Sequence, residues 1–424
     1  MKNPNELIDH FFRNESNKLI AALTRVLGPR NIDLVEDIVQ ETLSKALHKW
    51  SFEGIPPSPS GWIFRAAHNV AIDALRRNKF LSSNQEKIAE HLNYLLASNE
   101  KSVYEVSPEI EDDVLRLMFA CCDPILSRET QIALTLKILC SFHTKEIANA
   151  LLKEEAAVHK LIERGKEKLK ETTDIADFQK NIELGARLDT VLSNLYLLFN
   201  EGYKSSRGET LIRDQLCFEA IRLARLLTKH RFTHRTDTSA FLALLLFQSS
   251  RIPARVDDSG NMLLLKEQKR NLWDKSLIEE ALYFLNLSSQ GDQVSEYHLQ
   301  AGIAACHAFA ENYESTNWSK IIEPYTMLLT LNNSPIICLN RVVAILEGQG
   351  LENASRAFDE IELTKNLSSY YLYYLVRAEL ASRKKKYSDA LVDMNMALTL
   401  TLNNIERKYI LEKINAIKLL LIDK

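Results

Sequence analysis

The stretch that decides the fold reads Pro59-Ser-Gly-Trp-Ile-Phe-Arg-Ala-Ala-His-Asn-Val-Ala-Ile-Asp-Ala-Leu-Arg-Arg77. It follows the Gly- and Pro-rich segment 54–59, which is typical of a loop. On a helix of about 3.6 residues per turn, Arg65, Asn69 and Arg76 lie along one face. Guanidinium groups hold phosphates, and an amide can read a base edge. The stretch therefore predicts a helix that contacts nucleic acid, next to a loop able to receive an unstacked base.

Three helices are expected at this end of the chain. The first runs from Leu7 to Leu27 and stops at Gly28-Pro29, a strong breaker pair. The second runs from about Leu34 to Trp50, with Asp33 as its N-cap. The third begins at Ser60 and continues to about Phe80. Helices of this length are expected to form one compact unit.

The second helix is predicted to have an acidic face and an apolar face. Helical spacing places Leu34, Ile38 and Leu43 on the buried side. The opposite face carries Asp37, Gln40 and Glu41. Taken alone, such a face is more often an ordinary solvated surface than a binding site.

A second nucleic-acid-binding element is predicted after an acidic linker. Glu86 to Asp113 holds eight acidic residues and only two lysines, which favours a solvated linker. Short helices follow, among them one capped by Ser127 and one capped by Thr144. The helix capped by Thr144 and the next, Glu154 to Lys170, have helix-turn-helix proportions. The basic residues of the last helix are His159, Lys160, Arg164, Lys166, Lys168 and Lys170. Its mixed charge is also compatible with a plain solvated helix.

The second half of the chain, from about Ile182, is expected to be helix after helix. Tyr374 to Leu400 fits a tetratricopeptide-type unit, because small residues there let two helices approach closely. The residues that set this register are Ala378, Tyr387, Ala390 and Ala397. We therefore predict an all-α protein whose C-terminal part is an α-solenoid.

Composition limits the classes of function. The chain has 424 residues, a net charge of -3, and few helix breakers, with 12 Gly and 10 Pro. A protein that only coats nucleic acid is basic overall, so DNA binding here must depend on local patches or on a partner. The N-terminus lacks the pattern of a signal peptide, and the apolar run Ala240 to Phe247 is too short to span a bilayer. We expect a soluble cytoplasmic protein with no membrane partner.

No catalytic or metal site is predicted. Cys121, Cys122, Cys140 and His143 suggest zinc at first sight, but the first two are adjacent and no second Cys-x-x-Cys pair follows. Scattered buried thiols in a reducing compartment explain the six cysteines better. Phosphate loops, zinc-protease motifs and nucleophile elbows are missing from the sequence. We expect no catalysis, cofactor or metal.

The order of these motifs resembles the sigma-70 family of RNA polymerase sigma factors, extracytoplasmic-function type. The acidic helix followed by the Trp-led basic helix resembles the sigma-2 domain. Three further stretches resemble the long subgroup that carries a C-terminal tetratricopeptide-like extension: Glu111–Pro124, Leu195–Tyr203 and Gly260–Asp274. The resemblance implies a sigma-2 domain at 1–82, a linker at 83–109, a sigma-4 helix-turn-helix domain at 110–172 and a helical regulatory domain at 180–424.

The resemblance also implies partners and residue roles. The partners are the clamp helices and flap of the core polymerase, promoter DNA, and an intramolecular or protein partner of the extension. The residues that dock on the clamp are Asp37, Gln40 and Glu41. The contacts with the minus-ten element are Trp62, Arg65, Asn69, Arg76 and Arg77, with Asp73 orienting an arginine and the loop Ser51 to Ser58 capturing a flipped base. The contacts with the minus-thirty-five element are His159, Lys160, Arg164, Lys166 and Lys168. Leu152 and Leu161 stand where the family often has Gly and Arg, so weak or unusual upstream recognition is expected.

Two alternatives stay open. Asn200, Glu201, Gly202 and Tyr203 are either a regulatory contact or a helix end at which Gly202 forms a left-handed cap. The whole chain is either a dissociable transcription-initiation factor or a helical-repeat interaction scaffold with a vestigial DNA-binding head. The two functions differ in whether the acidic face is needed for association with polymerase.

Overall fold

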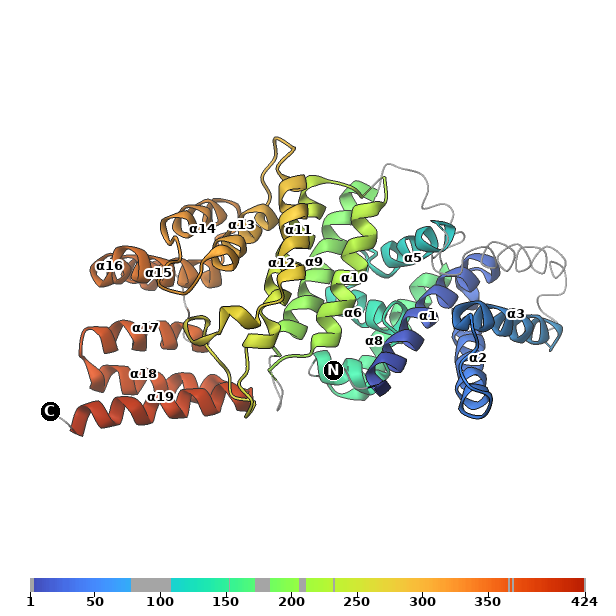
Figure 1. Cartoon of the computed structure of the whole chain (residues 1–424), viewed down its shortest axis with the longest axis horizontal. Coiled ribbons are helices and arrows are strands. Elements are labelled where there is room, and N and C mark those ends of the chain that lie inside the picture. The colour runs from blue at the N-terminus through green and yellow to red at the C-terminus, as the bar shows by residue number, and fades with distance from the viewer. Residues whose placement is uncertain are drawn as a thin grey trace. The chain divides into compact units, whose positions relative to one another are not determined.

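The protein is all-α, as expected from the sequence. The computed structural model describes residues 4–77, 108–151, 153–171, 184–205, 211–231, 233–364, 367 and 370–422. Within these ranges the regular structure consists of helices, plus one isolated bridge between Val256 and Met262 (Figure 1). The chain divides into two compact units. The first contains 1–195 and 229–233, and the second contains 196–228 and 234–424.

The first unit begins with three helices: α1 (Pro4–Leu27), α2 (Ile32–Glu53) and α3 (Pro59–Arg77). Gly28 adopts a φ of 81°, which ends α1, and a short 3-10 turn (Pro29–Asn31) leads into α2. The helices pack through apolar residues at helical spacing, among them Leu23, Ile38, Ile63 and Ala71. The prediction of three N-terminal helices is confirmed.

Four helices follow in the same unit: α5 (Pro108–Cys121), α6 (Arg128–Ile138), α7 (Thr144–Leu151) and α8 (Glu155–Glu171). Ser127 caps α6 by accepting a hydrogen bond from the backbone N–H of Thr130 at 3.3 Å, as predicted. Buried Asp113 links α5 to α1, because its Oδ2 lies 3.3 Å from Nη1 of Arg25.

Two predicted caps are wrong. Asn31 rather than Asp33 precedes α2, and Asp33 lies in the first turn, where its carboxylate pairs with lysines of α8. Thr144 is the first residue of α7 and does not cap it. The backbone N–H of His143 instead donates to Glu146 at 2.7 Å, so Glu146 stabilises the start of this helix.

The second unit is built from consecutive helices. The boundary between the units falls inside α9 (Leu184–Tyr203), after Leu195. α11 (Thr236–Ser250) is almost entirely buried and is apolar on every side along its middle, from Ala240 to Phe247. It therefore forms the centre of the packing with α12 and α13. The other long helices of the first half of this unit are α10 (Asp214–Lys229), α12 (Lys275–Ser288) and α13 (Glu296–Phe309).

The C-terminal helices pack as successive antiparallel neighbours, α17, α18 and α19 in Figure 1. Their bounds, with those of the three helices before them, are α14 (Ser319–Leu331), α15 (Pro335–Gln349), α16 (Leu351–Thr364), α17 (Tyr371–Arg383), α18 (Tyr387–Leu400) and α19 (Asn404–Ile422). Ala378, Ala390 and Ala397 are fully buried, so the predicted close approach through small residues is confirmed for this helix pair.

Some predictions fall on residues that the structure does not describe. Of the predicted linker 83–109 only its last two residues are described, and the end of the third predicted helix beyond Arg77 also lies outside the described residues. The same holds for Leu152 and for the side chain of Arg77.

Candidate functional site

The acidic face of α2 is exposed. Asp37, Gln40 and Glu41 all point to solvent, and Nζ of Lys45 lies 2.8 Å from Oε1 of Glu41 on the same helix. The opposite side is anchored in the core by Ile38, whose carbonyl accepts a hydrogen bond from buried Thr42 at 2.7 Å. The predicted division of this helix into an exposed polar face and a buried apolar face is confirmed. The binding role of the polar face is not tested by this geometry.

The basic face of α3 is also exposed. Arg65, Asn69 and Arg76 face solvent, and Asp73 lies between them with Oδ1 3.8 Å from Nη1 of Arg76. This ion pair fits the prediction that Asp73 orients a neighbouring arginine. Because both side chains are largely exposed, the pair contributes little to stability, and its effect is to position the guanidinium.

An aromatic cluster fixes the start of α3 against the end of α2. The rings of Trp50 and Trp62 meet edge to face with their centroids 5.6 Å apart. Phe12 of α1 packs on Trp50 with the ring centroids 5.5 Å apart. Trp62 is therefore a partly buried anchor of α3. Its ring is less accessible to DNA than the side chains of the exposed arginines Arg65 and Arg76.

The last turn of α2 and the segment after it expose apolar side chains that the sequence reasoning did not single out. Residues 51–53 of the predicted loop 51–58 belong to α2, so the loop begins at Gly54. Phe52 is 79% exposed and Ile55 is 66% exposed. The ring of Phe52 packs edge to face on His48, with the centroids 5.1 Å apart. Exposed aromatic rings are suited to stacking on an unpaired base. Phe52 could have been predicted from the sequence, because it is an aromatic residue within the predicted base-capturing segment, 51–58.

The predicted recognition helix α8 uses its basic residues in two ways. His159, Lys160 and Arg164 are exposed, and the last two share a face because they are four residues apart. Lys166 is only 8% exposed, because it turns toward α2. Nζ of Lys168 lies 3.1 Å from Oε2 of Glu171. The helix therefore presents the first three residues outward and keeps Lys166 inside the protein.

Lys166 is held by two acidic residues of α2. Its Nζ lies 2.5 Å from Oε2 of Glu36 and 3.0 Å from Oδ1 of Asp33. Burial alone would lower the pKa of Lys166, but its hydrogen bonds with Glu36 and Asp33 outweigh burial and raise it above the usual value. Nζ of Lys170 lies 2.6 Å from Oδ2 of Asp33 and strengthens the same cluster. Sequence reasoning missed the roles of Asp33 and Glu36.

A cavity of about 230 Å³ lies between the two predicted binding helices. On the α2 side its lining includes Asp37 and Gln40, and on the α8 side it includes His159, Glu163 and Lys166. Residues predicted to bind polymerase and residues predicted to bind DNA thus line one cavity inside the first unit.

The side chains of the motif at the end of α9, Asn200 to Tyr203, contact other residues of the second unit. Asn200 forms a side-chain hydrogen bond with Tyr196. Oε1 of Glu201 accepts a hydrogen bond from Ser205 at 3.3 Å and lies 3.7 Å from Nη1 of Arg213. A regulatory role for these residues remains a prediction.

Gly202 does not form the left-handed cap that was the second interpretation of this motif. It lies inside α9 without a positive φ. A Cβ at this position would lie 2.7 Å from Cβ of Leu216 and 2.8 Å from the backbone nitrogen of Cys217. The glycine is therefore required by the close approach of α9 and α10.

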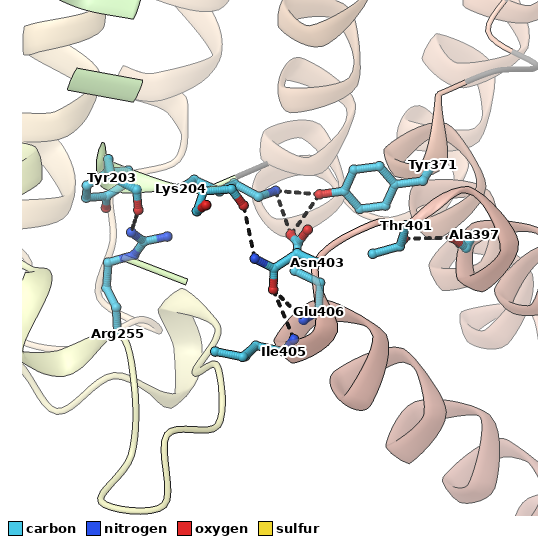
Figure 2. Close-up of polar contacts among 10 residues, drawn as sticks. Tyr203, Lys204, Arg255, Tyr371, Ala397, Thr401, Asn403, Ile405 and Glu406 are labelled. Carbon is cyan, nitrogen blue, oxygen red and sulfur yellow. Dashed lines mark hydrogen bonds and ion pairs between the residues drawn. The ribbon is translucent and has the colours of Figure 1, made fainter. Parts of the chain in front are cut away.

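Tyr203 connects the motif to the segment after α11. The guanidinium of Arg255 lies over the Tyr203 ring, 3.7 Å from its centroid, and Nη1 donates to the Tyr203 carbonyl (Figure 2). The ring also stacks on Phe199, with centroids 5.6 Å apart. Burial lowers the pKa of Arg255 despite these contacts.

The next residues connect α9 to the C-terminal helices of the same unit. Figure 2 shows the side chain of Lys204 between Tyr371 and Glu406. Its Nζ lies 2.5 Å from Oη of Tyr371 and 2.8 Å from Oε1 of Glu406. The Tyr371 hydroxyl donates to Glu406 at 2.8 Å, and burial raises its pKa, so it stays protonated. Asn403 caps α19 and donates to the Ser205 carbonyl at 3.1 Å. This network explains how the motif supports the fold.

Five of the six cysteines are buried, as predicted, and Cys306 is partly exposed. Cys121, Cys122 and Cys140 are almost completely inaccessible, and burial raises the pKa of Cys122 to about 11. Within the ranges that the structure describes, no three His, Cys, Asp or Glu side chains are grouped so that they could hold a metal ion. In the same ranges no helix has the length and apolar character needed to cross a membrane.

Comparison with known proteins identifies the N-terminal domain. Residues 11–80, which contain α2 and α3, match Sigma-70 region 2. Residues 187–289 match a family of unknown function, DUF6596. The chain therefore carries a sigma-70 region 2 domain at its N-terminus. It belongs to the same family as the uncharacterized protein R00370 of Rhizobium meliloti (strain 1021), to which it is 34% identical over 402 residues, covering 92% of this chain and 93% of that protein. No solved structure matches the chain.

Proposed function

We propose that the chain is an alternative sigma factor of the extracytoplasmic-function type, which directs core RNA polymerase to specific promoters in the cytoplasm. The observation that carries the proposal is the match to region 2 over the two helices whose polar faces are exposed. In this role the chain makes and breaks no covalent bond. Its contribution is binding energy directed to the polymerase and to melted DNA.

The acidic face of α2 is the proposed polymerase contact. Asp37, Gln40 and Glu41 are exposed, and the helix beneath them is fixed by the buried Ile38 and Thr42. A rigid helix that presents carboxylates and an amide is suited to a basic groove on a partner. Exposed charges of this kind govern the association rate and the choice of partner.

The basic face of α3, with the end of α2 and the turn between the two helices, forms the proposed minus-ten contact. Arg65 and Arg76 supply positive charge for phosphates, and Asn69 supplies an amide for a base edge. Exposed Phe52 extends this surface with a ring for stacking. The combination favours unpaired over paired DNA, because stacking and pocket contacts offset the cost of extruding a base.

The helix pair α7 and α8 is the proposed reader of the minus-thirty-five element. Lys160 and Arg164 face solvent from the middle of α8, as a recognition helix requires. The near-neutral net charge of -3 implies weak binding to free DNA, because affinity for the backbone rises with the number of phosphates neutralised. Polymerase must therefore supply most of the affinity for promoter DNA.

The helices beyond about residue 180 are the proposed regulatory domain, with tetratricopeptide-like packing in α17 and α18. Support comes from the fully buried alanines between these helices. The order of helices through the second unit also fits a solenoid, in which each helix pair packs mainly on its neighbours. This domain would gate the activity of the N-terminal domains.

The first experiment is gel filtration of the purified chain with core polymerase. The wild type should co-elute, and Asp37→Lys combined with Gln40→Ala should abolish co-elution. Glu352→Lys, the same charge reversal on an exposed position of α16, is the control and should co-elute like the wild type. An interaction scaffold with a vestigial head would be indifferent to the Asp37 and Gln40 changes, and that result would overturn the proposal.

The second experiment separates polymerase binding from DNA opening. Arg65→Ala and Asn69→Ala should leave co-elution unchanged and lower run-off transcription about tenfold or more, since a base or phosphate contact contributes about 1–3 kcal/mol. Full run-off activity in both variants would remove α3 from the DNA-opening mechanism.

A further inference from the structure

In the described part of the second unit, three arginines have no acidic partner. Nε of Arg251 donates to the amide oxygen of Gln268 at 3.3 Å, and Nη1 of Arg270 donates to the His307 carbonyl at 2.7 Å. Nη1 of Arg255 donates to the Tyr203 carbonyl. All three acceptors are neutral. Among the residues that the structure describes, none of these guanidinium groups forms an ion pair.

Two of these arginines lie on the same buried indole. The Cζ atoms of Arg270 and Arg251 lie 4.1 Å and 5.3 Å from the centroid of the Trp273 ring, and Trp273 is only 4% exposed. Cation–π contacts offset part of the cost of desolvating a guanidinium, but two cations on one ring repel each other. Burial and the charge of Arg251 both lower the pKa of Arg270. The indole of Trp273 therefore does not neutralise the positive charges of Arg251 and Arg270.

Polar atoms in the same place have no hydrogen-bond partner among the residues that the structure describes. They are Nη2 of Arg270, Nε1 of Trp273 and Nδ1 of His307. Buried polar atoms in native proteins are nearly always hydrogen-bonded, and an unsatisfied charged donor is especially unfavourable. Two of the three atoms are obligate donors, so together they call for an acceptor. A negatively charged acceptor would also neutralise the arginines.

Within the described ranges, acidic side chains do not supply this acceptor. Glu314 is the acidic residue whose charge acts on Arg270, but it is exposed and forms no ion pair with it. Glu406 acts on Arg255 from a distance while its Oε1 is bound to Lys204 and Tyr371. Arg251 raises the positive potential at both other arginines.

We propose that the cluster formed by Arg251, Arg270, Trp273 and His307 is a binding site for a small oxyanion, either phosphate or a carboxylate. Guanidinium groups bind both anions through charge-assisted hydrogen bonds, and the indole N–H adds a donor of fixed direction. The cluster lies between the end of α11, the segment 268–273 and α13. A ligand bound there joins three elements of the second unit and stabilises their packing. The site acts independently of polymerase and DNA, so it does not rest on the proposed sigma function.

Calorimetric titration of the full chain with sodium phosphate, and separately with citrate, at matched ionic strength tests the proposal. Saturable binding of at least one of them in the millimolar range or tighter is expected, with a rise in melting temperature that grows with anion concentration. Arg270→Gln and Arg251→Gln should each weaken binding about tenfold or more. Binding of phosphate alone or of citrate alone identifies which of the two chemistries the site takes.

Matched controls make the result decisive. Arg356→Gln removes an exposed arginine of α16 and should leave binding unchanged. Glu314→Gln should leave binding unchanged or strengthen it, because it removes the competing negative charge. Retained helix content in each variant by circular dichroism excludes misfolding, and Arg270→Lys, which keeps the charge, should bind with intermediate affinity. If neither anion binds saturably, or if Arg270→Gln and Arg356→Gln bind equally well, the proposal is overturned.

Discussion

Nζ of Lys166 on α8 lies 2.5 Å from Oε2 of Glu36 on α2, and both side chains are about one-tenth exposed. The pair joins residues of the predicted recognition helix and the predicted polymerase-binding helix within one unit. Because Asp33 also approaches Lys166, the lysine is neutralised inside the protein. In this arrangement Lys166 stabilises the fold, and the outward DNA-binding capacity of α8 depends on the other basic residues.

The first prediction concerns this ion pair. Lys166→Ala should lower the free energy of unfolding by roughly 1–3 kcal/mol, because buried Glu36 would keep only its longer contact with Nζ of Lys137, at 3.8 Å. Chemical denaturation of the first unit, followed by circular dichroism, measures the change. Lys160→Ala, on the exposed face of the same helix, should change stability by less than about 0.5 kcal/mol. Equal effects of the two substitutions would show that the Lys166 pair does not stabilise the unit.

The second prediction concerns promoter binding by the polymerase complex. Lys160→Ala and Arg164→Ala should each weaken upstream binding and reduce the slope of log affinity against log salt by about 1. Both side chains are exposed on one face of α8. Affinity of the holoenzyme for promoter DNA, measured over a series of salt concentrations, gives the slope. Lys168→Ala should have a smaller effect, because Lys168 is partly engaged by Glu171. An unchanged slope in all three variants would remove α8 from the DNA interface.

The third prediction concerns the glycine in the α9 motif. Gly202→Ala should destabilise the second unit by about 1–3 kcal/mol, because the new Cβ would meet backbone and side-chain atoms of α10 at under 3.0 Å. Gly302→Ala is the matched control. Gly302 lies inside α13 with nothing within 4 Å of the added Cβ, so alanine there should be neutral or stabilise by up to about 1 kcal/mol. Differential scanning calorimetry of both variants gives the comparison, and destabilisation of similar size in both would contradict the packing argument.

Local pattern was sufficient to predict most of the fold. Helical periodicity placed the exposed side chains of α2 and α3 correctly, because an amphipathic helix must bury its apolar stripe. The turn residues Gly28 and Gly54 marked real helix ends, each with a φ of 81°. The alanines between α17 and α18 were predictable because small residues permit close helix packing.

Contacts between distant residues were not predictable from the same patterns. A lysine in the mixed-charge helix α8 gave no sign that it binds Glu36, which lies 130 positions earlier in the sequence. Asp33 was assigned to a cap because an acid before an apolar run usually has that role, but two lysines offered stronger partners. The sequence allowed Gly202 to be interpreted as a helix cap. The close approach of α9 to α10, which requires a glycine there, depends on where α10 packs. Arg251 and Arg270 carry no local sign of their role, because their neutral acceptors lie 17 and 37 positions away in the sequence.

The last prediction is a dependence of stability on pH that arises at His307. Burial and the charges of Arg251 and Arg270 lower its pKa from 6.5 to about 3, so the folded protein keeps this imidazole neutral. The unfolded chain binds a proton there below about pH 6.5, so stability attributable to His307 is present above that pH and is lost as pH falls toward 3. The loss is at most about 1.4 kcal/mol per pH unit. His307→Phe should flatten the fall in melting temperature of the second unit between pH 7 and 5, and the exposed His159→Gln should not. The difference between wild type and variant isolates this one site, and parallel pH profiles would mean that the pKa of His307 is not lowered in the folded protein.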